Sequence, residues 1–155
     1  MYVFDTNTFS QLFHSYYPKR FPTLWDQFNT LVRNSKITST REVMRELEGD
    51  REEKLREWAK TRRDIFPTPD AHEARFVRDI FAVEHFQNII EQKKLLKGGL
   101  NADPFVVARA RAIDGTVVTL ERESPNGAKI PNICRHFDIP YRSLEGFMED
   151  EGWTF

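Results

Sequence analysis

The sequence predicts an α/β sandwich built around a mostly parallel sheet. Short apolar, β-prone runs alternate with longer segments whose apolar residues keep helical spacing, an order typical of parallel sheets with helical connections. Acidic residues follow the β-prone runs or begin the helices after them. Folds of this class bind ligands at the carboxyl ends of their strands, so these acids are also the first candidates for a functional site.

The predicted strands are short runs of apolar and β-branched residues. They are YVF (2–4), KITS (36–39) and TVVTLE (116–121), of which the last is the clearest. A proline-punctuated connector over 65–70 offers a further short strand at Ile65–Phe66. A polar loop over 122–129 and a short apolar stretch over 130–137 follow the clearest strand.

Seven segments carry apolar residues at helical spacing and are predicted helices. They span 8–17, 21–34, 39–49, 50–63, 71–97, 103–114 and 143–151. Pro18 ends the first helix, and Thr23 and Ser39 are the expected caps of the second and third. Gly98–Gly99 ends the fifth.

Length and composition predict one soluble domain. The chain has 155 residues, 39% hydrophobic and 30% charged, and no repeat or linker divides it, so we expect a single domain over 1–155. No apolar run approaches the ~18 residues that span a bilayer, and the N-terminus lacks the order of a signal peptide. Cys134 is the single cysteine, which excludes an internal disulfide and predicts a cytoplasmic location. The formal charge of −1 means that a polyanionic partner needs a local basic patch or bound cations.

Four acidic residues occupy related positions along the chain. Asp5 ends the first strand, and Glu46 lies on the helix after the second. Asp103 begins a helix, and Glu121 ends the third strand. In a parallel sheet these acids can meet at one edge, and clustered carboxylates stay ionised only if cations neutralise them. Oxygen ligands suit Mg²⁺ or Mn²⁺, and no His or Cys cluster indicates zinc.

Each acid also has a structural interpretation. Asp5 fits the cap of the helix after it, and Asp103–Pro104 fits a cap followed by the first helical residue. Ser39–Glu42 fits a capping box, which favours Glu46, one turn later, as the ligand. Glu42 and Glu46 share a helix face, so the choice between them stays open.

Short polar residues beside the acids are candidates to orient them. Thr6 and Asn7 follow Asp5 directly, and Thr119 precedes Glu121 by two residues. Hydrogen bonds from such side chains fix the orientation of ligating carboxylates. The alternative is that Thr6 and Asn7 only satisfy the start of the helix.

Basic residues near the acids are candidates for holding the phosphates of RNA. They are Arg41, Arg45, Lys93, Lys94, Lys97, Arg109 and Arg111. A solvated helix face is the alternative for each. The histidines are scattered and are predicted to be surface or packing residues. They are His14, His72, His85 and His136.

Four pieces of the sequence occur in an order and spacing typical of one known family. They are VFDTN (3–7), REVMREL (41–47), NADPFVVARA (101–110) and TVVTLE (116–121). In this pattern the chain resembles the PIN-domain nucleases, the fold of VapC-type toxins. The closing stretch KIPNICRHFDI (129–139) further resembles a little-characterised PIN-like bacterial and archaeal group.

The resemblance implies a three-layer α/β/α sandwich and Mg²⁺- or Mn²⁺-dependent cleavage of RNA. It also implies a cognate antitoxin in many cases and a homodimer in some. Asp5, Glu46 and Asp103 match the core acids that hold the metal, and Glu121 stands where the family's fourth catalytic acid is usually Asp. The helical material over 50–97 is longer than in many of these toxins and suits a clamp or a partner surface.

Three other functions fit parts of the pattern. A PIN-like module that binds RNA or protein without cutting is favoured by Glu121 in place of Asp. A DNA nuclease would use the same carboxylate chemistry. An aspartyl phosphotransferase of the haloacid dehalogenase type usually carries a second Asp two positions after the first, where this chain has Asn7.

Overall fold

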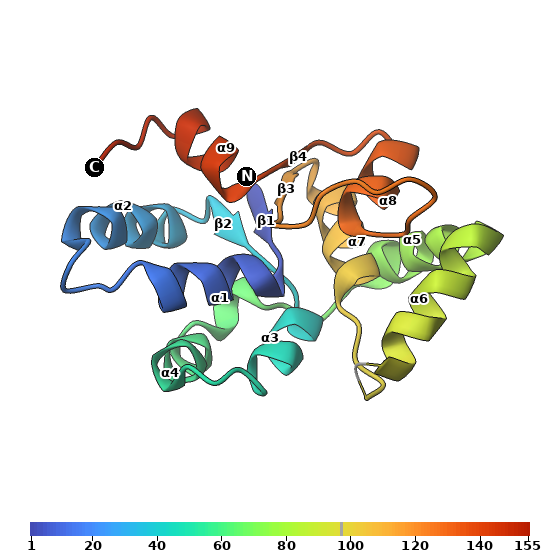
Figure 1. Ribbon diagram of the computed structural model, residues 1–155, viewed down its shortest axis with the longest axis horizontal. Helices are drawn as coiled ribbons and strands as arrows, with labels where there is room; N and C mark the ends of the chain where they lie inside the picture. The colour runs from blue at the N-terminus through green and yellow to red at the C-terminus, as the bar shows by residue number, and fades with distance from the viewer. Residues whose placement is uncertain (97) are drawn as a thin grey trace.

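A parallel four-stranded sheet forms the centre of the computed structural model, which describes residues 1–96 and 98–155 (Figure 1). Its strands are β1 (Tyr2–Phe4), β2 (Ile37–Thr38), β3 (Thr116–Val118) and β4 (Tyr141–Arg142). They lie in the order β2-β1-β3-β4, and every neighbouring pair is parallel. The sheet therefore confirms the α/β class and the parallel arrangement predicted from the sequence.

Helices connect the strands and cover the sheet. They are α1 (Thr6–Ser15), α2 (Pro22–Arg33), α3 (Arg41–Leu47), α4 (Glu53–Thr61), α5 (Ala71–Ala82), α6 (Glu84–Leu96), α7 (Asp103–Ile113), α8 (Ile130–His136) and α9 (Leu144–Asp150). A 3-10 turn, η1 (Arg63–Ile65), follows α4. Within residues 1–96 and 98–155, no helix has the length and apolar character needed to cross a membrane.

Aromatic packing covers one face of the sheet. The ring of Phe4 lies 5.4 Å from Phe9 of α1, 6.2 Å from Phe28 of α2 and 5.1 Å from Phe147 of α9, measured between ring centroids. Tyr2, two residues earlier on β1 and on the same face, also contacts Phe147. Many of the phenylalanines therefore pack in this half of the core.

The opposite face is covered by α7, which packs on β1 and β3. Helices α5 and α8 pack against α7, and α6 packs against α5. Figure 1 shows this group, drawn from green to orange, on the other side of the sheet from α1 and α2. The fold is thus the predicted three-layer α/β/α sandwich.

Several predicted boundaries are wrong. The single helix expected over 71–97 is two helices, because Val83 leaves the helical conformation with ψ of 104°; residue 97 lies outside the described residues. Ile65–Phe66 is not a strand, since Ile65 closes η1. The cap of α2 is Phe21 rather than Thr23, and Pro22 occupies its first turn.

Two elements near the C-terminus were not predicted. The apolar stretch after the polar loop is a helix, α8, and Tyr141–Arg142 adds the fourth strand. The third strand is shorter than predicted, because it ends at Val118. Thr119 and Glu121 therefore lie in the loop that leaves the sheet.

Candidate metal centre

Three strands end at one edge of the sheet, and the segments that leave it begin with Asp5, Ser39 and Thr119. These segments are joined by hydrogen bonds. The Ser39 hydroxyl donates to the carbonyl oxygen of Phe4 at 2.7 Å, and the Asp5 amide donates to Val118 at 3.2 Å. The carboxyl ends of β1, β2 and β3 thus form one rigid platform.

Asp5 is buried at the centre of this platform, with 4% of its surface exposed. Its Oδ1 accepts hydrogen bonds from the backbone amide of Thr8 at 2.8 Å and from the Thr8 hydroxyl at 2.6 Å. Its Oδ2 accepts from the Thr119 hydroxyl at 2.6 Å. The cap interpretation of Asp5 is confirmed, and both carboxylate oxygens are held in fixed directions.

Burial raises the pKa of Asp5 from 3.8 to about 6. The hydrogen bonds from Thr119 and Thr8 oppose this shift, and the nearby negative charge of Asp103 adds to it. A carboxylate in this position is ionised near neutral pH at a cost in folding free energy. A bound cation would offset that cost.

The raised pKa predicts that the contribution of Asp5 to the stability of the metal-free protein decreases as the pH rises. The folded protein binds more protons than the unfolded chain between about pH 4 and pH 6, so the Asp5 contribution is present below pH 4 and lost above pH 6. The shift corresponds to about 3 kcal/mol. We expect Asp5→Asn to remove this part of the pH dependence in urea unfolding with EDTA, measured at pH 4.5 and 7.5. An identical pH dependence in both proteins would contradict the assignment.

Glu46 of α3 connects the segment that carries Asp5 with the segment that carries Asp103. Its Oε1 accepts a hydrogen bond from the Thr6 hydroxyl at 2.6 Å, and its Oε2 accepts from the Ala102 amide at 3.3 Å. Thr6 follows Asp5 and Ala102 precedes Asp103, so the Glu46 carboxylate lies between the other two acids. Thr6 takes the orienting position predicted for it, although the acid that it contacts is Glu46.

The capping box predicted at the start of α3 is wrong. The cap is Thr40, whose side chain makes no capping hydrogen bond, and the Ser39 hydroxyl is directed to β1 instead. Glu42 forms ion pairs with Arg41 at 2.7 Å and Arg45 at 3.2 Å. The two candidates on α3 differ in these contacts, because Glu46 bonds to the residues next to Asp5 and Asp103 whereas Glu42 bonds to two arginines of its own helix.

Asp103 is the first residue of α7 rather than its cap, which is Ala102. It is buried, with 6% of its surface exposed, and the Lys93 ammonium lies 3.1 Å from its Oδ2. Its backbone amide donates to the Asn101 side chain at 3.2 Å. Lys93 was predicted to contact RNA, and the structure instead places its charge against a proposed metal ligand.

Glu121 lies beyond the end of β3 and is linked to Asp5 through Thr119. The Glu121 amide donates to the Thr119 hydroxyl at 3.1 Å, and that hydroxyl donates to Asp5. The Glu121 carboxylate accepts from the backbone amide of Ile130, at the start of α8, at 2.9 Å. Thr119 therefore orients Asp5, as a supporting residue would, while Glu121 and Asn7 line the same cavity next to the site.

The other basic candidates lie around the site with different partners. Arg45 and Lys94 line a cavity between α3 and the start of α7, together with Glu42. Lys97 lies outside the described residues. Arg109 lies 3.6 Å from buried Glu73, and Arg111 stacks over an aromatic ring, so both have structural partners.

The donor chemistry of the site fits Mg²⁺ or Mn²⁺, because its acids offer carboxylate oxygens. The Lys93 ammonium places one positive charge beside Asp103, where a bound metal ion would supply another. Across residues 1–96 and 98–155, however, no three His, Cys, Asp or Glu side chains are grouped closely enough to hold a metal ion. The chemical type of these side chains therefore suits a divalent metal ion, but their carboxylates do not converge on a single position.

Thr8 was missed by sequence reasoning although it makes two of the hydrogen bonds to Asp5. The signal was present, since a helix cap bonds to the residue three positions later. The Lys93 ion pair had no comparable signal, because it depends on how α6 lies against α7.

Comparison with known proteins bears on the fold. The family model described as "Domain of unknown function (DUF4411)" matches residues 2–155. A chain of the crystal structure of VapBC2 from Rickettsia felis, bound to a DNA fragment from their promoter, is similar over 92% of this chain and 98% of that chain. The TM-score is 0.51 and the sequence identity is 15%, a likeness that supports the predicted PIN-like fold. No curated protein matches the sequence.

Proposed function

The chain belongs to the DUF4411 family. On the basis of its PIN-like fold we propose that it is an endoribonuclease. The proposed cofactor is Mg²⁺ or Mn²⁺, bound by Asp5, Glu46 and Asp103. The proposed reaction is hydrolysis of RNA phosphodiester bonds, as the toxin of a toxin–antitoxin pair.

The observation that carries this proposal is the position of Glu46. Its carboxylate bonds to Thr6, next to Asp5, and to Ala102, next to Asp103. Glu46 is thus linked to the segments that carry Asp5 and Asp103, which supports a common role for the three acids. A structural role explains one such carboxylate readily, but it does not explain why two of them are buried beside the third.

The residues of the site divide the work of binding and orientation. Thr8 and Thr119 hold the two oxygens of Asp5, and Thr6 holds Glu46. When bound, a divalent ion supplies a water of lowered pKa and offsets the charge of the phosphate and of the leaving oxygen. No side-chain nucleophile is needed.

Lys93 has a second role in this proposal. Its ammonium balances Asp103 in the free protein, and three-quarters of its side chain is covered. Lys93 thus remains a candidate for phosphate contact, now at the catalytic corner rather than on an open helix face.

The partner proposed for this chain is an antitoxin protein. The support is the likeness to VapBC2, whose structure contains a complex bound to promoter DNA. The helices α4 to α6 are the part of the chain longer than in many toxins of this type and are the first place to look for that contact.

A second candidate is a PIN-like module that binds RNA or protein without cutting. The observation that favours it concerns Glu121, whose carboxylate accepts a hydrogen bond from the backbone of α8. The PIN-domain nucleases that the sequence resembles usually have the shorter Asp at this position, as a metal ligand. The lack of a closed carboxylate group in the described residues points the same way.

Metal-dependent cleavage of single-stranded RNA distinguishes the two functions. We expect cleavage with Mn²⁺ or Mg²⁺, none with EDTA, and none of a DNA strand of the same sequence. Replacing Glu46 with Gln is expected to lower the initial rate at least ~100-fold, equal to about 2.7 kcal/mol of barrier. The measurement is gel-resolved cleavage of a labelled oligonucleotide.

The matched control is Glu48→Gln, because Glu48 is exposed at the end of the same helix. It is expected to cut at the wild-type rate. Wild-type protein that binds RNA and leaves it intact with both metals would reject the nuclease and favour the binding module. Cleavage of the DNA strand at an equal rate would change the substrate class.

A further inference from the structure

One side of α1 is polar and faces a cavity next to the acidic corner. Its side chains recur at intervals of three and four residues, so they project from one side of the helix, while Phe9, Leu12 and Phe13 are buried on the other. The cavity measures about 280 Å³. Its lining residues are Asn7, Ser10, Gln11, His14, Leu120 and Glu121.

The cavity begins where the proposed metal site ends. Asn7 is two residues beyond Asp5, and Glu121 is joined to Asp5 through the Thr119 hydroxyl. From there the cavity follows α1 to His14, roughly 10 Å further along the helix axis. A strand whose phosphate lies at the acids would therefore place its neighbouring nucleotide here.

The lining suits the sugar and base of a nucleotide better than its phosphate. It offers amide, hydroxyl and imidazole groups and the Glu121 carboxylate, and among residues 1–96 and 98–155 neither lysine nor arginine contributes to it. Phosphates are bound mainly by cationic groups and backbone amides, whereas amide and imidazole groups pair with base edges and with the ribose 2′-hydroxyl.

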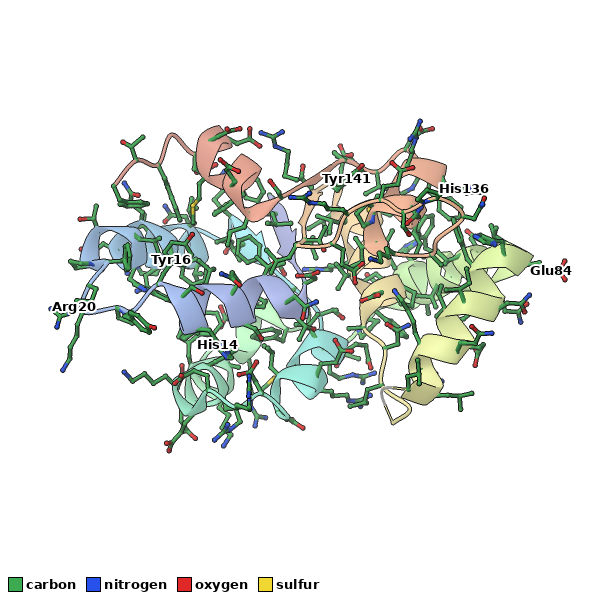
Figure 2. All side chains as sticks on the ribbon, in the orientation of Figure 1. His14, Tyr16, Arg20, Glu84, His136 and Tyr141 are labelled. Carbon is green, nitrogen blue, oxygen red and sulfur yellow. The ribbon has the colours of Figure 1, made fainter. Side chains whose placement is uncertain are left out.

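His14 is held in a defined orientation. Its Nε2 lies 2.8 Å from Asp50 Oδ1, on the side of α1 that faces the connection between α3 and α4 (Figure 2). The Ser10 hydroxyl bonds to the other oxygen of Asp50 at 2.5 Å. Burial raises the pKa of Asp50, and hydrogen bonds from Ser10, from a backbone amide and from His14 outweigh it, so the pKa is lowered. The acceptor beside His14 is thus a carboxylate.

This pairing determines what His14 presents to a ligand. A carboxylate only accepts hydrogen bonds, so Nε2 donates to Asp50 and Nδ1 is left for a ligand, as an acceptor in the neutral ring and as a donor in the imidazolium. Gln11 also has groups left for a ligand, because its amide nitrogen donates one N–H to Ser15 at 2.9 Å and keeps a second N–H beside the carbonyl oxygen. A 2′-hydroxyl both donates and accepts hydrogen bonds, and base edges carry donors and acceptors, so both can pair with these groups.

We propose that Gln11 and His14 on this face of α1 bind the ribose 2′-hydroxyl and base edge of the nucleotide next to the cleaved phosphate of single-stranded RNA, an inference that rests on the function proposed above. Both residues select the substrate and neither touches the reacting atoms. This subsite gives the protein a means to distinguish RNA from DNA at a site whose carboxylate chemistry is common to both.

The test is binding of a labelled single-stranded RNA, and of the DNA strand with the same sequence, measured by fluorescence anisotropy. Ca²⁺ replaces Mn²⁺, and a gel of the recovered RNA shows that it stays intact. We expect wild-type protein to bind RNA more tightly than DNA. Gln11→Ala and His14→Ala are each expected to weaken RNA binding roughly fivefold, as for one lost hydrogen bond, and to weaken DNA binding less, because DNA keeps the base edge and lacks the 2′-hydroxyl.

The matched controls are Gln87→Ala and His72→Ala, which change the same residue types at exposed positions of α6 and α5. They are expected to bind both strands as wild type does. Equal affinity of wild type for RNA and DNA, unchanged RNA affinity in both α1 variants, or no RNA binding at all would overturn the inference. Selective binding without cleavage under Mn²⁺ would support the subsite and reject the nuclease, so the two failures are distinguishable.

Discussion

Asp5→Asn is expected to reduce Mn²⁺-dependent RNA cleavage at least ~1,000-fold, equal to about 4 kcal/mol of barrier. Asparagine keeps the size of the side chain and an oxygen for the Thr8 hydrogen bonds, but it loses the negative charge that a divalent cation needs. The measurement is the initial rate on a labelled RNA strand at saturating Mn²⁺.

The variant must remain folded for this result to count. Because burial raises the pKa of Asp5, removing its charge is expected to leave the unfolding midpoint in EDTA unchanged or higher at pH 7.5. Mn²⁺ should stabilise wild type against unfolding and have a smaller effect on the variant. Asp26→Asn, at an exposed position of α2, is the control and should cut normally. Wild-type activity in the Asp5 variant would exclude Asp5 as a ligand.

Phe9→Ala is expected to lower the free energy of unfolding by about 3–5 kcal/mol. Phe9 is completely buried, and its ring lies 5.4 Å from Phe4 of β1, 5.6 Å from Trp58 of α4 and 5.5 Å from Phe66. Its removal leaves a cavity at the junction of α1, α4 and the sheet. Urea unfolding followed by tryptophan fluorescence and by circular dichroism measures the loss.

Tyr17→Ala is the matched control, since this aromatic side chain is 59% exposed. It is expected to change the stability by less than about 0.5 kcal/mol. A loss below 1 kcal/mol for Phe9→Ala would mean that α1 does not depend on the aromatic cluster. Because Phe9 follows Thr8, the same packing holds α1 in the position from which Thr8 reaches Asp5.

Two of the predicted strands have a strong local signal, and the strand that was missed has none. YVF and TVV each end in two buried apolar residues, as runs at the centre of a parallel sheet usually do. Tyr141–Arg142 has only two residues, both at least partly exposed, at the edge of the sheet. Its extended conformation comes from pairing with β3, which a local pattern does not record.

The break between α5 and α6 was missed for a similar reason. The break at Val83 is not marked by a glycine or proline, and apolar residues keep helical spacing on both sides of it. The break lets α6 pack against α5, which itself packs against α7, so tertiary contact decides the boundary. The reverse error occurred at Ser39, whose sequence fits a cap and whose hydroxyl is drawn to β1 instead.

The sequence by itself determined the fold class and the identity of the candidate acids, because hydrophobic periodicity and the placement of carboxylates after strands are local properties. Only the tertiary structure decided that Glu46 rather than Glu42 bonds to the residues next to Asp5 and Asp103, that Lys93 lies against Asp103, and that Glu121 reaches the start of α8. The physical reason is that a side chain's partner depends on the distance between elements far apart in the chain. That distance is set by core packing, which sums many contacts that no single segment contains.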